Sequence, residues 1–387
     1  MKYQFRDARR LLSIALLLSI LPLAGCFSEP DSPILPEESG INQGIPLIPS
    51  TPHQADIEII AEDDLTPPEE GMVRSPLTNE WVDAEQAATR PIAVMVPNEN
   101  AALPHYNLSK ASVLYEANVE ERMTRLMAIF DNWDEYEKIG NIRSTRTYYA
   151  YWAFEWDAFL VHYGGPYYIN TLMEQEDTEH VDGLTLPQSD RTFYRTKDRT
   201  SPHNVYLNGS LLTDCLASKG YSLPYRGLTE EEHFRFTPKA KPNSLSQYKQ
   251  KAKNATYIDM SGCYPLTRCY FEYNEDDGLY YRSQHLSGGK DIPHCDADGT
   301  QLSFKNISIQ YTKQEVLDDK GYLVLQCHDD TRDGWFFTNG KGIHITWKKD
   351  SDYGATRYYD ENGEEIELNT GKTMICIVNE KDSFTFR

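Results

Sequence analysis

Two arginines are the residues whose type and spacing point most directly to chemistry. Arg143 and Arg146 lie three positions apart near the start of a segment that we expect to be helical. Their guanidinium groups would then share one face beside free backbone N–H groups, and both features favour phosphate or carboxylate. The alternative is that both arginines pair with internal acids such as Glu116, Glu120 or Asp157 and only brace the fold.

Two histidines in predicted loops form a second group of candidates. His162 ends a predicted strand, and His203 follows a proline. Because histidine titrates near neutral pH, either could perform acid–base chemistry or bind a metal together with Glu120 or Asp182. The sequence contains no HExxH, GxSxG or P-loop pattern. A histidine bonded to the backbone of a structural loop is the commoner arrangement, and we predict neither a metal nor a cofactor.

A third pair of polar residues lies in the second part of the chain. His294 and Asp296 are two positions apart, on one side of a predicted extended segment. Their alternative role is an Asx turn beside an exposed histidine. The candidate acid–base residues are therefore Glu120, His162, Asp182 and His203, and the candidate ligand-binding residues are Arg143, Ser144, Arg146, His162, Gly164, Gly165, His203, Asn204, His294 and Asp296.

The first 25 residues are typical of a signal peptide. A basic start is followed by the apolar run Leu11 to Ala24, about 14 residues long, whereas a membrane-spanning helix needs roughly 20. The run ends in Leu23-Ala24-Gly25-Cys26, which resembles a bacterial lipobox. We predict that Cys26 carries a diacylglycerol and anchors the chain to the outer face of the cell membrane. An ordinary secretory signal is the alternative.

Residues 26–72 are rich in proline and acid and poor in aromatic side chains. Such a composition cannot bury enough apolar surface to fold, so we predict a disordered tether. The whole chain has a formal charge of -21, and loss of the signal peptide makes this about -24. So acidic a chain repels phosphate backbones, which argues against nucleic acid as a partner, although a local basic pocket could still bind an anion.

The body is predicted to have two parts, an α/β part over 73–225 and a mainly antiparallel β part over 226–387. In the first, apolar runs at 91–96, 123–130 and 158–163 predict buried strands. Aromatic residues at helical spacing predict a helix over 144–156, capped by Ser144 and facing the core, and a second helix covers 167–176.

In the second part, Asn339-Gly340 and Asn362-Gly363 predict hairpins within an antiparallel meander over 342–378. Earlier strands are expected at 256–260, 269–273, 279–282 and 304–310. The fold class is thus α+β. Six cysteines remain after Cys26, an even number that permits disulfides without requiring them, and Cys263 with Cys269 is the one bridge that we single out.

Several segments resemble the YerB-like family of bacterial lipoproteins, whose two domains have no assigned function. The resemblance covers nearly the whole body. It rests on Arg90-Pro91-Ile92-Ala93-Val94-Met95, Glu120 through Thr124-Arg125, Ile139 to Arg146, His162-Tyr163-Gly164-Gly165, Pro202 to Tyr206, Pro293-His294-Cys295-Asp296, Lys305-Asn306, Ile345 to Lys348 and Leu368 to Thr373.

The chain departs from the family pattern in two places. The family usually has glycines after the glutamate, where this chain has Glu121 and Arg122, and it tends to have a proline and an aromatic residue where this chain has Thr370 and Met374. The first departure puts in doubt any approach of a ligand to the backbone beside Glu120.

Two functions from different classes follow from these observations. The first is a membrane-anchored binding or scaffolding lipoprotein that holds an anionic or glycan ligand of the envelope and presents its β part to a protein partner. The second is an envelope hydrolase or transferase acting on a cell-wall polymer, with Glu120 or Asp182 as acid or base and the arginines stabilising developing charge. Convergence of the candidate residues in one pocket would favour the enzyme.

Overall fold

The computed structural model describes residues 65–229, 232–286 and 290–387, which lie in one compact unit. The predictions for the signal peptide, for Cys26 and for most of the tether fall on residues 1–64, outside the described residues. The first described strand, β1 (Met72–Arg74), pairs with β2 (Trp81–Asp83). Met72, the last residue of the predicted tether, therefore already belongs to a strand.

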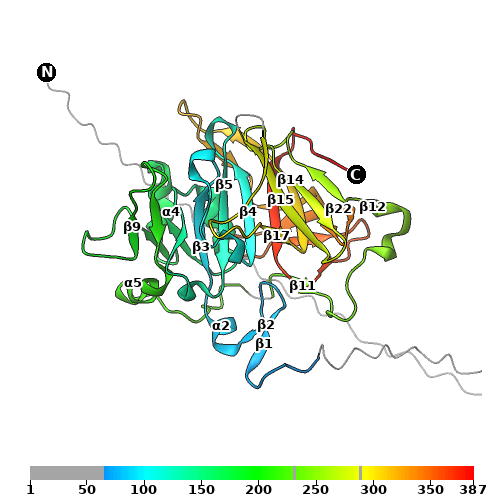
Figure 1. Cartoon of the computed structure of the whole chain (residues 1–387), viewed down its shortest axis with the longest axis horizontal. Coiled ribbons are helices and arrows are strands. Elements are labelled where there is room, and N and C mark those ends of the chain that lie inside the picture. The colour runs from blue at the N-terminus through cyan, green and yellow to red at the C-terminus, as the bar shows by residue number, and fades with distance from the viewer. Residues whose placement is uncertain (1–64, 230–231, 287–289) are drawn as a thin grey trace, which may run out of the picture. The chain divides into compact units, whose positions relative to one another are not determined.

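One large mixed sheet organises the described residues (Figure 1). Its central strands are mostly apolar and completely buried, as is typical of strands covered on both faces. In spatial order the 11 strands are β12 (Lys253–Asn254), β22 (Lys341–Lys349), β21 (Asp329–Thr338), β18 (Asn306–Thr312), β25 (Thr373–Asn379), β4 (Val113–Asn118), β5 (Thr124–Phe130), β3 (Ile92–Pro97), β7 (Phe159–His162) and β8 (His180–Asp182), with β23 (Arg357–Tyr359) also pairing β22.

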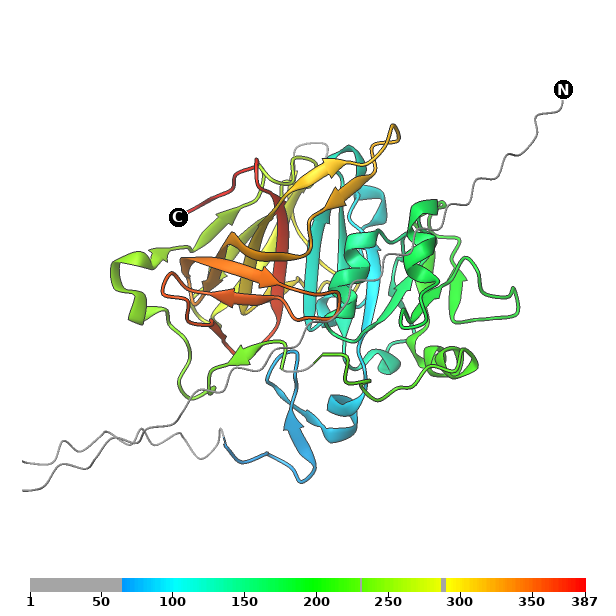
Figure 2. The same cartoon turned by 180° about the vertical axis from the view of Figure 1, so that it is seen from behind.

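Strand β25 joins the two parts of the chain within this sheet. It pairs in parallel with β18 on one side and with β4 on the other, so that Thr373 lies beside both Asn306 and Val113. Figure 2 shows the red strand β25 next to the cyan strands of the first part. Strands from both sides of the predicted boundary at residue 225 thus share one hydrogen-bonded sheet.

The predicted meander is correct only in its first half. Asn339 and Gly340 connect β21 and β22, and both have the positive φ that a tight hairpin turn requires. The Asn362-Gly363 turn follows β23, as predicted. Beyond it, Glu365 forms an antiparallel bridge with Tyr359, as a hairpin requires. The antiparallel order then ends, because β24 (Glu367–Leu368) pairs in parallel with β11 (Arg235–Phe236) and β25 is parallel to both of its neighbours.

A second sheet is antiparallel throughout and comes from the second part of the chain. The α+β fold class, with a mixed first part and an antiparallel sheet in the second, is therefore confirmed. The strands of the second sheet are β16 (Lys290–Pro293), β15 (Leu279–Leu286), β14 (Tyr270–Asn274), β13 (Tyr257–Asp259), β26 (Thr385–Phe386) and β17 (Ser303–Phe304); smaller sheets pair β6 (Ile139–Gly140) and β9 (Phe193–Arg195) with β10 (Val205–Leu207), and β19 (Gln314–Val316) with β20 (Leu323–Leu325).

The helices that the structure describes are short. The predicted aromatic helix is α3 (Thr147–Phe154), which starts three residues later than predicted and has no side-chain cap, so the Ser144 cap was wrong. Its core-facing stripe is confirmed, since Tyr148, Tyr149 and Trp152 are all buried. The other helices are α2 (Ala84–Ala88), α4 (Asn170–Met173) and α5 (Leu212–Ser218), with 3-10 turns η1 (Asn100–Ala102), η2 (Leu108–Lys110), η3 (Glu120–Arg122), η4 (Trp133–Glu135), η5 (Tyr167–Ile169), η6 (Gly209–Leu211) and η7 (Ser246–Lys251).

The six cysteines from Cys215 to Cys376 are all free thiols, so the Cys263–Cys269 bridge was wrong. Five of the six are buried. Among the described residues, no helix has the length and apolarity needed to span a bilayer.

A buried ion pair connects the two sheets. Glu116 on β4 and Arg282 on β15 have fully buried side chains, and an Arg282 nitrogen lies 2.8 Å from Glu116 Oε2. Burial alone would lower the pKa of Arg282, but the charge of Glu116 outweighs it and raises that pKa. Asn98 donates a further hydrogen bond of 2.9 Å to Glu116.

Replacing Glu116 by Gln should leave the guanidinium of Arg282 buried without its counter-charge. Removal of one partner from a buried pair costs about 3–5 kcal/mol, so we expect urea unfolding of the full-length protein to show a loss of that size. In the exposed pair Lys313–Glu315, Glu315→Gln should change stability by no more than about 1 kcal/mol. Equal losses in the two variants would show that the buried pair does not hold the sheets together.

Candidate functional site

Three arginines approach one another where β3, β5 and the segment before α3 meet. Arg125 is the second residue of β5 and pairs with Pro97 at the end of β3. The backbone N–H of Arg143 donates to Met95 of β3, and Arg146 immediately precedes α3. Arg143 and Arg146 lower the pKa of Arg125 electrostatically. We refer to Arg125, Arg143 and Arg146 as the arginine cluster.

Glu120 supplies a carboxylate to this cluster. Its two oxygens accept hydrogen bonds of 2.6 Å from Nε and Nη2 of Arg146, a bidentate arrangement. Burial raises the pKa of Glu120, but the hydrogen bonds and charge of Arg146, with the charge of Arg125, lower it further, so the net shift is downward. Glu120 is therefore ionised at neutral pH, which suits a counter-ion better than a proton donor.

The other two arginines are not fully satisfied. Arg125 is only 4% exposed and donates to the carbonyl of Ser144, yet its Nε has no hydrogen-bond partner. Burial and the neighbouring guanidinium groups lower the pKa of Arg125 to about 10. The Nε of Arg143 is also buried and unpartnered, and the described residues offer Arg143 no ion pair. The cluster thus carries three positive charges against the one carboxylate of Glu120.

Two tyrosines border the cluster. Burial raises the pKa of Tyr168 to about 12, with Arg146 opposing the shift, and its hydroxyl has no hydrogen-bond partner. The Tyr322 ring centroid lies 5.3 Å from the guanidinium carbon of Arg146. An incoming anion would therefore meet a hydroxyl donor as well as guanidinium groups.

His162, at the end of β7, has its own set of hydrogen-bond partners, which does not include the arginines. It is 2% exposed, with its Nδ1 2.9 Å from the Gly164 carbonyl and its Nε2 3.0 Å from Nδ1 of His180. Asp182 accepts hydrogen bonds from the backbone N–H groups of Gly164 and Leu184. These contacts hold the turn after β7, which is the structural alternative that we considered for His162.

The two glycines of this turn are required by its geometry. Gly164 has a φ of +76°, which glycine adopts easily, and a Cβ on Gly165 would lie 3.1 Å from Ile169. Ser144 donates to the Tyr163 carbonyl at 3.1 Å. All three residues therefore have structural contacts in the turn.

His203 lies near Arg143. Burial lowers its pKa, Glu99 opposes the shift, and Arg143 and Arg199 add to it. Its Nδ1 is buried without a partner. The side-chain amide of the neighbouring Asn204 is already hydrogen-bonded within the protein, since it accepts from Arg195 and donates to the Thr196 carbonyl.

His294 and Asp296 lie inside the molecule. His294 is fully buried between Arg282 and His105, with 3.0 Å between Nε2 of His294 and Nδ1 of His105, so the expectation of an exposed histidine was wrong. Asp296 accepts hydrogen bonds from the backbone N–H groups of Leu108 and Ser109 at 3.0 and 2.7 Å. Both residues hold the second part of the chain against the first.

The structure therefore brings together Arg143, Arg146 and Glu120, with His203 beside Arg143. The turn that follows His162 is joined to this segment by backbone hydrogen bonds from Tyr163 to Arg143 and from Thr145 to Gly164, but the imidazole of His162 bonds to Gly164 and His180 and not to the arginines. His294 and Asp296 bond to His105, Leu108 and Ser109. Arg125 is the member of the cluster that the sequence did not single out. Its signal was a charged residue at the start of an otherwise apolar strand. Within the described ranges, no group of three His, Cys, Asp or Glu side chains could hold a metal ion.

Two family models match most of this chain. One, described as the N-terminal domain of a protein of unknown function (DUF3048), matches residues 77–222, and the C-terminal domain of the same family matches residues 260–375. The chain belongs to the DUF3048 family. The arginine cluster lies entirely within the N-terminal DUF3048 domain.

The chain is also similar to a curated protein and to a solved structure. The chain is 26% identical over 324 residues to the protein named "Putative lipoprotein YerB" of Bacillus subtilis (strain 168), covering 83% of this chain and 90% of that one. The crystal structure of YerB from Bacillus subtilis matches with a TM-score of 0.67 and 25% identity, over 81% of this chain and 99% of that one.

The departure of this chain from the family pattern coincides with unusual backbone geometry. Glu121 and Arg122 both have positive φ, +57° and +59°, in the region that glycine adopts most easily. They occupy the positions where the resemblance led us to expect glycines. The side chains add contacts that glycines would lack, because Arg122 pairs with Asp382 at 2.9 Å.

The buried imidazoles of His162 and His180 predict a loss of stability in acid. Burial and the charge of His162 lower the pKa of His180 to about 4, against about 6.5 in an unfolded chain. As the pH falls, His180 is protonated in the unfolded chain before it is protonated in the folded one. The free energy of unfolding is therefore highest above about pH 6.5 and decreases as the pH falls toward 4. We expect His180→Asn to reduce the loss across that window by roughly 1–2 kcal/mol, allowing for partial exposure.

Urea unfolding between pH 7.5 and pH 4 measures this difference. Gln188→Ala, a neutral exposed position six residues after Asp182 in the chain, should keep the wild-type pH profile. A profile that His180→Asn leaves unchanged would show that the imidazole is not held neutral.

Proposed function

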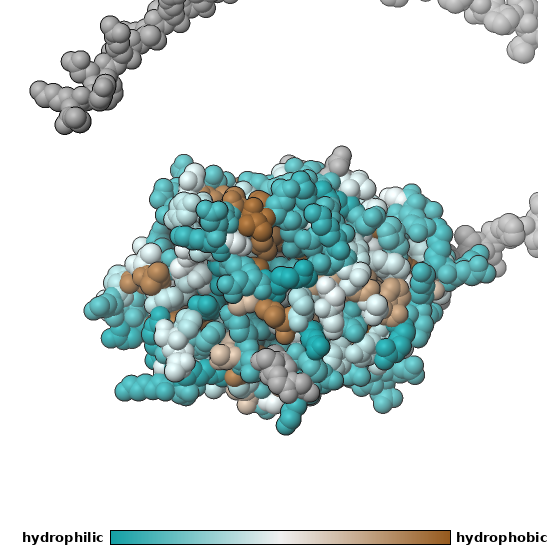
Figure 3. All heavy atoms as spheres, turned by 90° about the horizontal axis from the view of Figure 1, so that it is seen from above, coloured by the Kyte–Doolittle hydropathy of each residue, from teal (hydrophilic) through white to brown (hydrophobic). Residues whose placement is uncertain are grey.

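We propose that this protein is an extracytoplasmic binding protein, held at the cell membrane by a lipid on Cys26, that captures an anionic ligand at the arginine cluster. The signal pattern and lipobox support the anchor, as does the printed name of the related YerB. The face in Figure 3 is mostly hydrophilic, with hydrophobic side chains in separate groups. A covalent lipid rather than the acidic surface would therefore provide attachment.

Replacing Cys26 by Ala should release the protein from the membrane, because the thiol that accepts the lipid is gone. The measurement is the distribution of full-length protein between membrane and soluble fractions, together with incorporation of a labelled fatty acid. Wild-type protein should be labelled and should sediment with membranes, whereas the variant should do neither. Cys215→Ala is the matched control and should behave as wild type, since Cys215 is buried. Membrane retention of an unlabelled Cys26 variant would overturn the anchor.

One observation carries the ligand proposal: two buried guanidinium nitrogens, Nε of Arg125 and Nε of Arg143, lack any partner in a cluster with a single carboxylate. Buried polar groups are almost always hydrogen-bonded, and a buried charge without a partner is costly. A phosphate or carboxylate group of an envelope polymer or small molecule would satisfy both nitrogens and reduce the excess charge.

The enzyme alternative has less support from the geometry. It requires Glu120 or Asp182 to exchange a proton beside the arginines and histidines. Glu120 is the ionised partner of Arg146, while Asp182 and His162 hold the turn after β7. The candidate acids and bases are therefore spread over separate contacts, which favours binding over catalysis.

Replacing Arg143 by Gln should weaken anion binding at least about tenfold, because it removes a charged guanidinium group whose Nε is free to donate to the anion. The measurement is the increase in thermal unfolding temperature of the full-length protein with inorganic phosphate or pyrophosphate, fitted to a Kd. Arg143→Lys should bind with intermediate affinity, since it keeps the positive charge but loses the planar set of N–H donors that can bond an anion in a bidentate way.

The exposed Arg191, which contacts only nearby backbone carbonyls, provides the control. Arg191→Gln should bind as wild type does. Failure of both anions to stabilise the wild-type protein, or an equal effect of the two Gln variants, would remove the arginine cluster as a site.

A further inference from the structure

The outer edge of the large sheet is interrupted on β22. One side of β22 pairs with β21 along its length. On the other side, β12 pairs with residues 341–342 and β23 pairs with residues 346–348. No described strand pairs with the outer edge of Ile343, His344 and Ile345. The chain therefore leaves a gap of three residues between two short covering strands.

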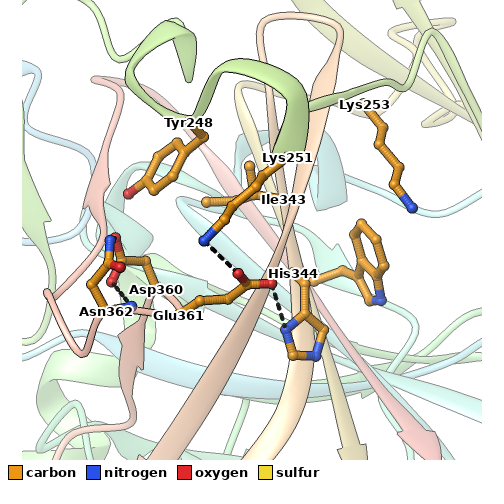
Figure 4. A pocket seen from close by; sticks show the side chains of 9 residues that line it. Tyr248, Lys251, Lys253, Ile343, His344, Asp360, Glu361 and Asn362 are labelled. Atoms are coloured by element: carbon orange, nitrogen blue, oxygen red, sulfur yellow. Dashed lines mark hydrogen bonds and ion pairs between the residues drawn. The ribbon is translucent and has the colours of Figure 1, made fainter.

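A cavity of about 310 Å³ lies at this gap (Figure 4). Ile343 and His344 of β22 form its base, and Tyr248 and Lys251 of η7 lie on one side. On the other side is the turn after β23, with Glu361. Its volume is at the lower end of the range for small-molecule sites, about 300–1,000 Å³.

An aromatic side chain on β21 forms part of the wall. Trp335 is partly exposed and is held by ring contacts with Phe386 at 4.9 Å and with His344 at 5.8 Å. The ammonium of Lys253 lies 5.5 Å from the Trp335 ring centroid, and its exposed side chain can move aside. The indole is thus positioned before any ligand arrives, which reduces the ordering cost of binding.

The polar groups of the cavity balance in charge. Two cations, Lys251 and Lys253, and two carboxylates, Asp360 and Glu361, line it, and Asn362 adds an uncharged amide. In Figure 4 Lys251 points to Glu361, and its Nζ lies 2.7 Å from Oε2 of Glu361. The other oxygen of Glu361 lies 3.9 Å from Nδ1 of His344. A strongly charged ligand would gain little here, whereas a neutral ligand with many hydroxyl groups would find both donors and acceptors.

The ion pair across the cavity can be rearranged at little cost. The side chains of Lys251 and Glu361 are 57% and 45% exposed, and exposed pairs contribute little to stability. Hydroxyl groups of a ligand could therefore take over part of their hydrogen bonding.

We propose that this cavity binds a neutral saccharide, with a sugar ring against Trp335 and its hydroxyl groups bonded to Lys251, Glu361 and Asn362. An amphipathic ring matches a wall that combines an indole face with polar groups of both kinds. The site is independent of the arginine cluster, because it comes from β12, β21, β22, η7 and the turn after β23 and shares no residue with it.

The test uses full-length protein with two neutral probes, triacetylchitotriose and maltotriose, and saturation-transfer NMR to measure binding. Trp335→Ala should abolish binding of the probe that wild-type protein takes. Because Trp335 also packs against Phe386, Glu361→Ala provides a second variant at an exposed position, and it should weaken binding by about fivefold or more. Trp81→Ala removes a tryptophan of the β1–β2 hairpin and should bind as wild type does.

Saturable binding that Trp335→Ala or Glu361→Ala reduces, and that Trp81→Ala and Arg143→Gln leave unchanged, would support the saccharide site. Absence of binding of both probes at millimolar concentrations would overturn it. Binding that Arg143→Gln alone reduces would also overturn it and would place the sugar at the arginine cluster.

Discussion

The buried carboxylate of Glu116 is the constraint on which the two sheets depend. It lies on β4 opposite Cys376 of β25, at the parallel junction between the two parts of the chain. A charge at this depth requires close counter-charge and hydrogen bonds. Arg282 from the second sheet and Asn98 from the loop after β3 supply them. The sheets therefore cannot separate without leaving a charge in an apolar interior.

A second buried carboxylate, that of Glu155, is also surrounded by a counter-charge and hydrogen-bond donors. Glu155 is fully buried and accepts hydrogen bonds from Tyr115 and Thr356, with Lys349 at 3.3 Å. Burial would raise the pKa of Glu155, but the charge of Lys349 and further contacts lower it to about 2. The arginine cluster differs in its charge balance, since three guanidinium groups share the one carboxylate of Glu120, whereas Arg282, whose Nε also lacks a partner, has Glu116 as its counter-charge. That contrast within one molecule is the reason for proposing an external anion there.

The two proposed binding sites lie far apart in the large sheet. The arginine cluster is at the ends of β3 and β5, whereas the saccharide cavity is on β21 and β22. Six strand spacings separate β22 from β3, which is about 29 Å along the sheet. A single small molecule could not occupy both sites.

The sequence by itself determined most of the local structure. The apolar runs at β3, β5 and β7, the aromatic face of α3 and the Asn339-Gly340 hairpin were all predictable, because each depends on periodicity or on a turn that few residues can adopt. It also named Arg143, Arg146 and Glu120. Only the tertiary structure decided which strands pair and which charges meet. Parallel pairing of β25 with β4 and the Glu116–Arg282 contact join residues far apart in the chain. Such contacts leave no local pattern, which is why the neighbours of Arg125 and the cavity beside Trp335 could not be found from the sequence.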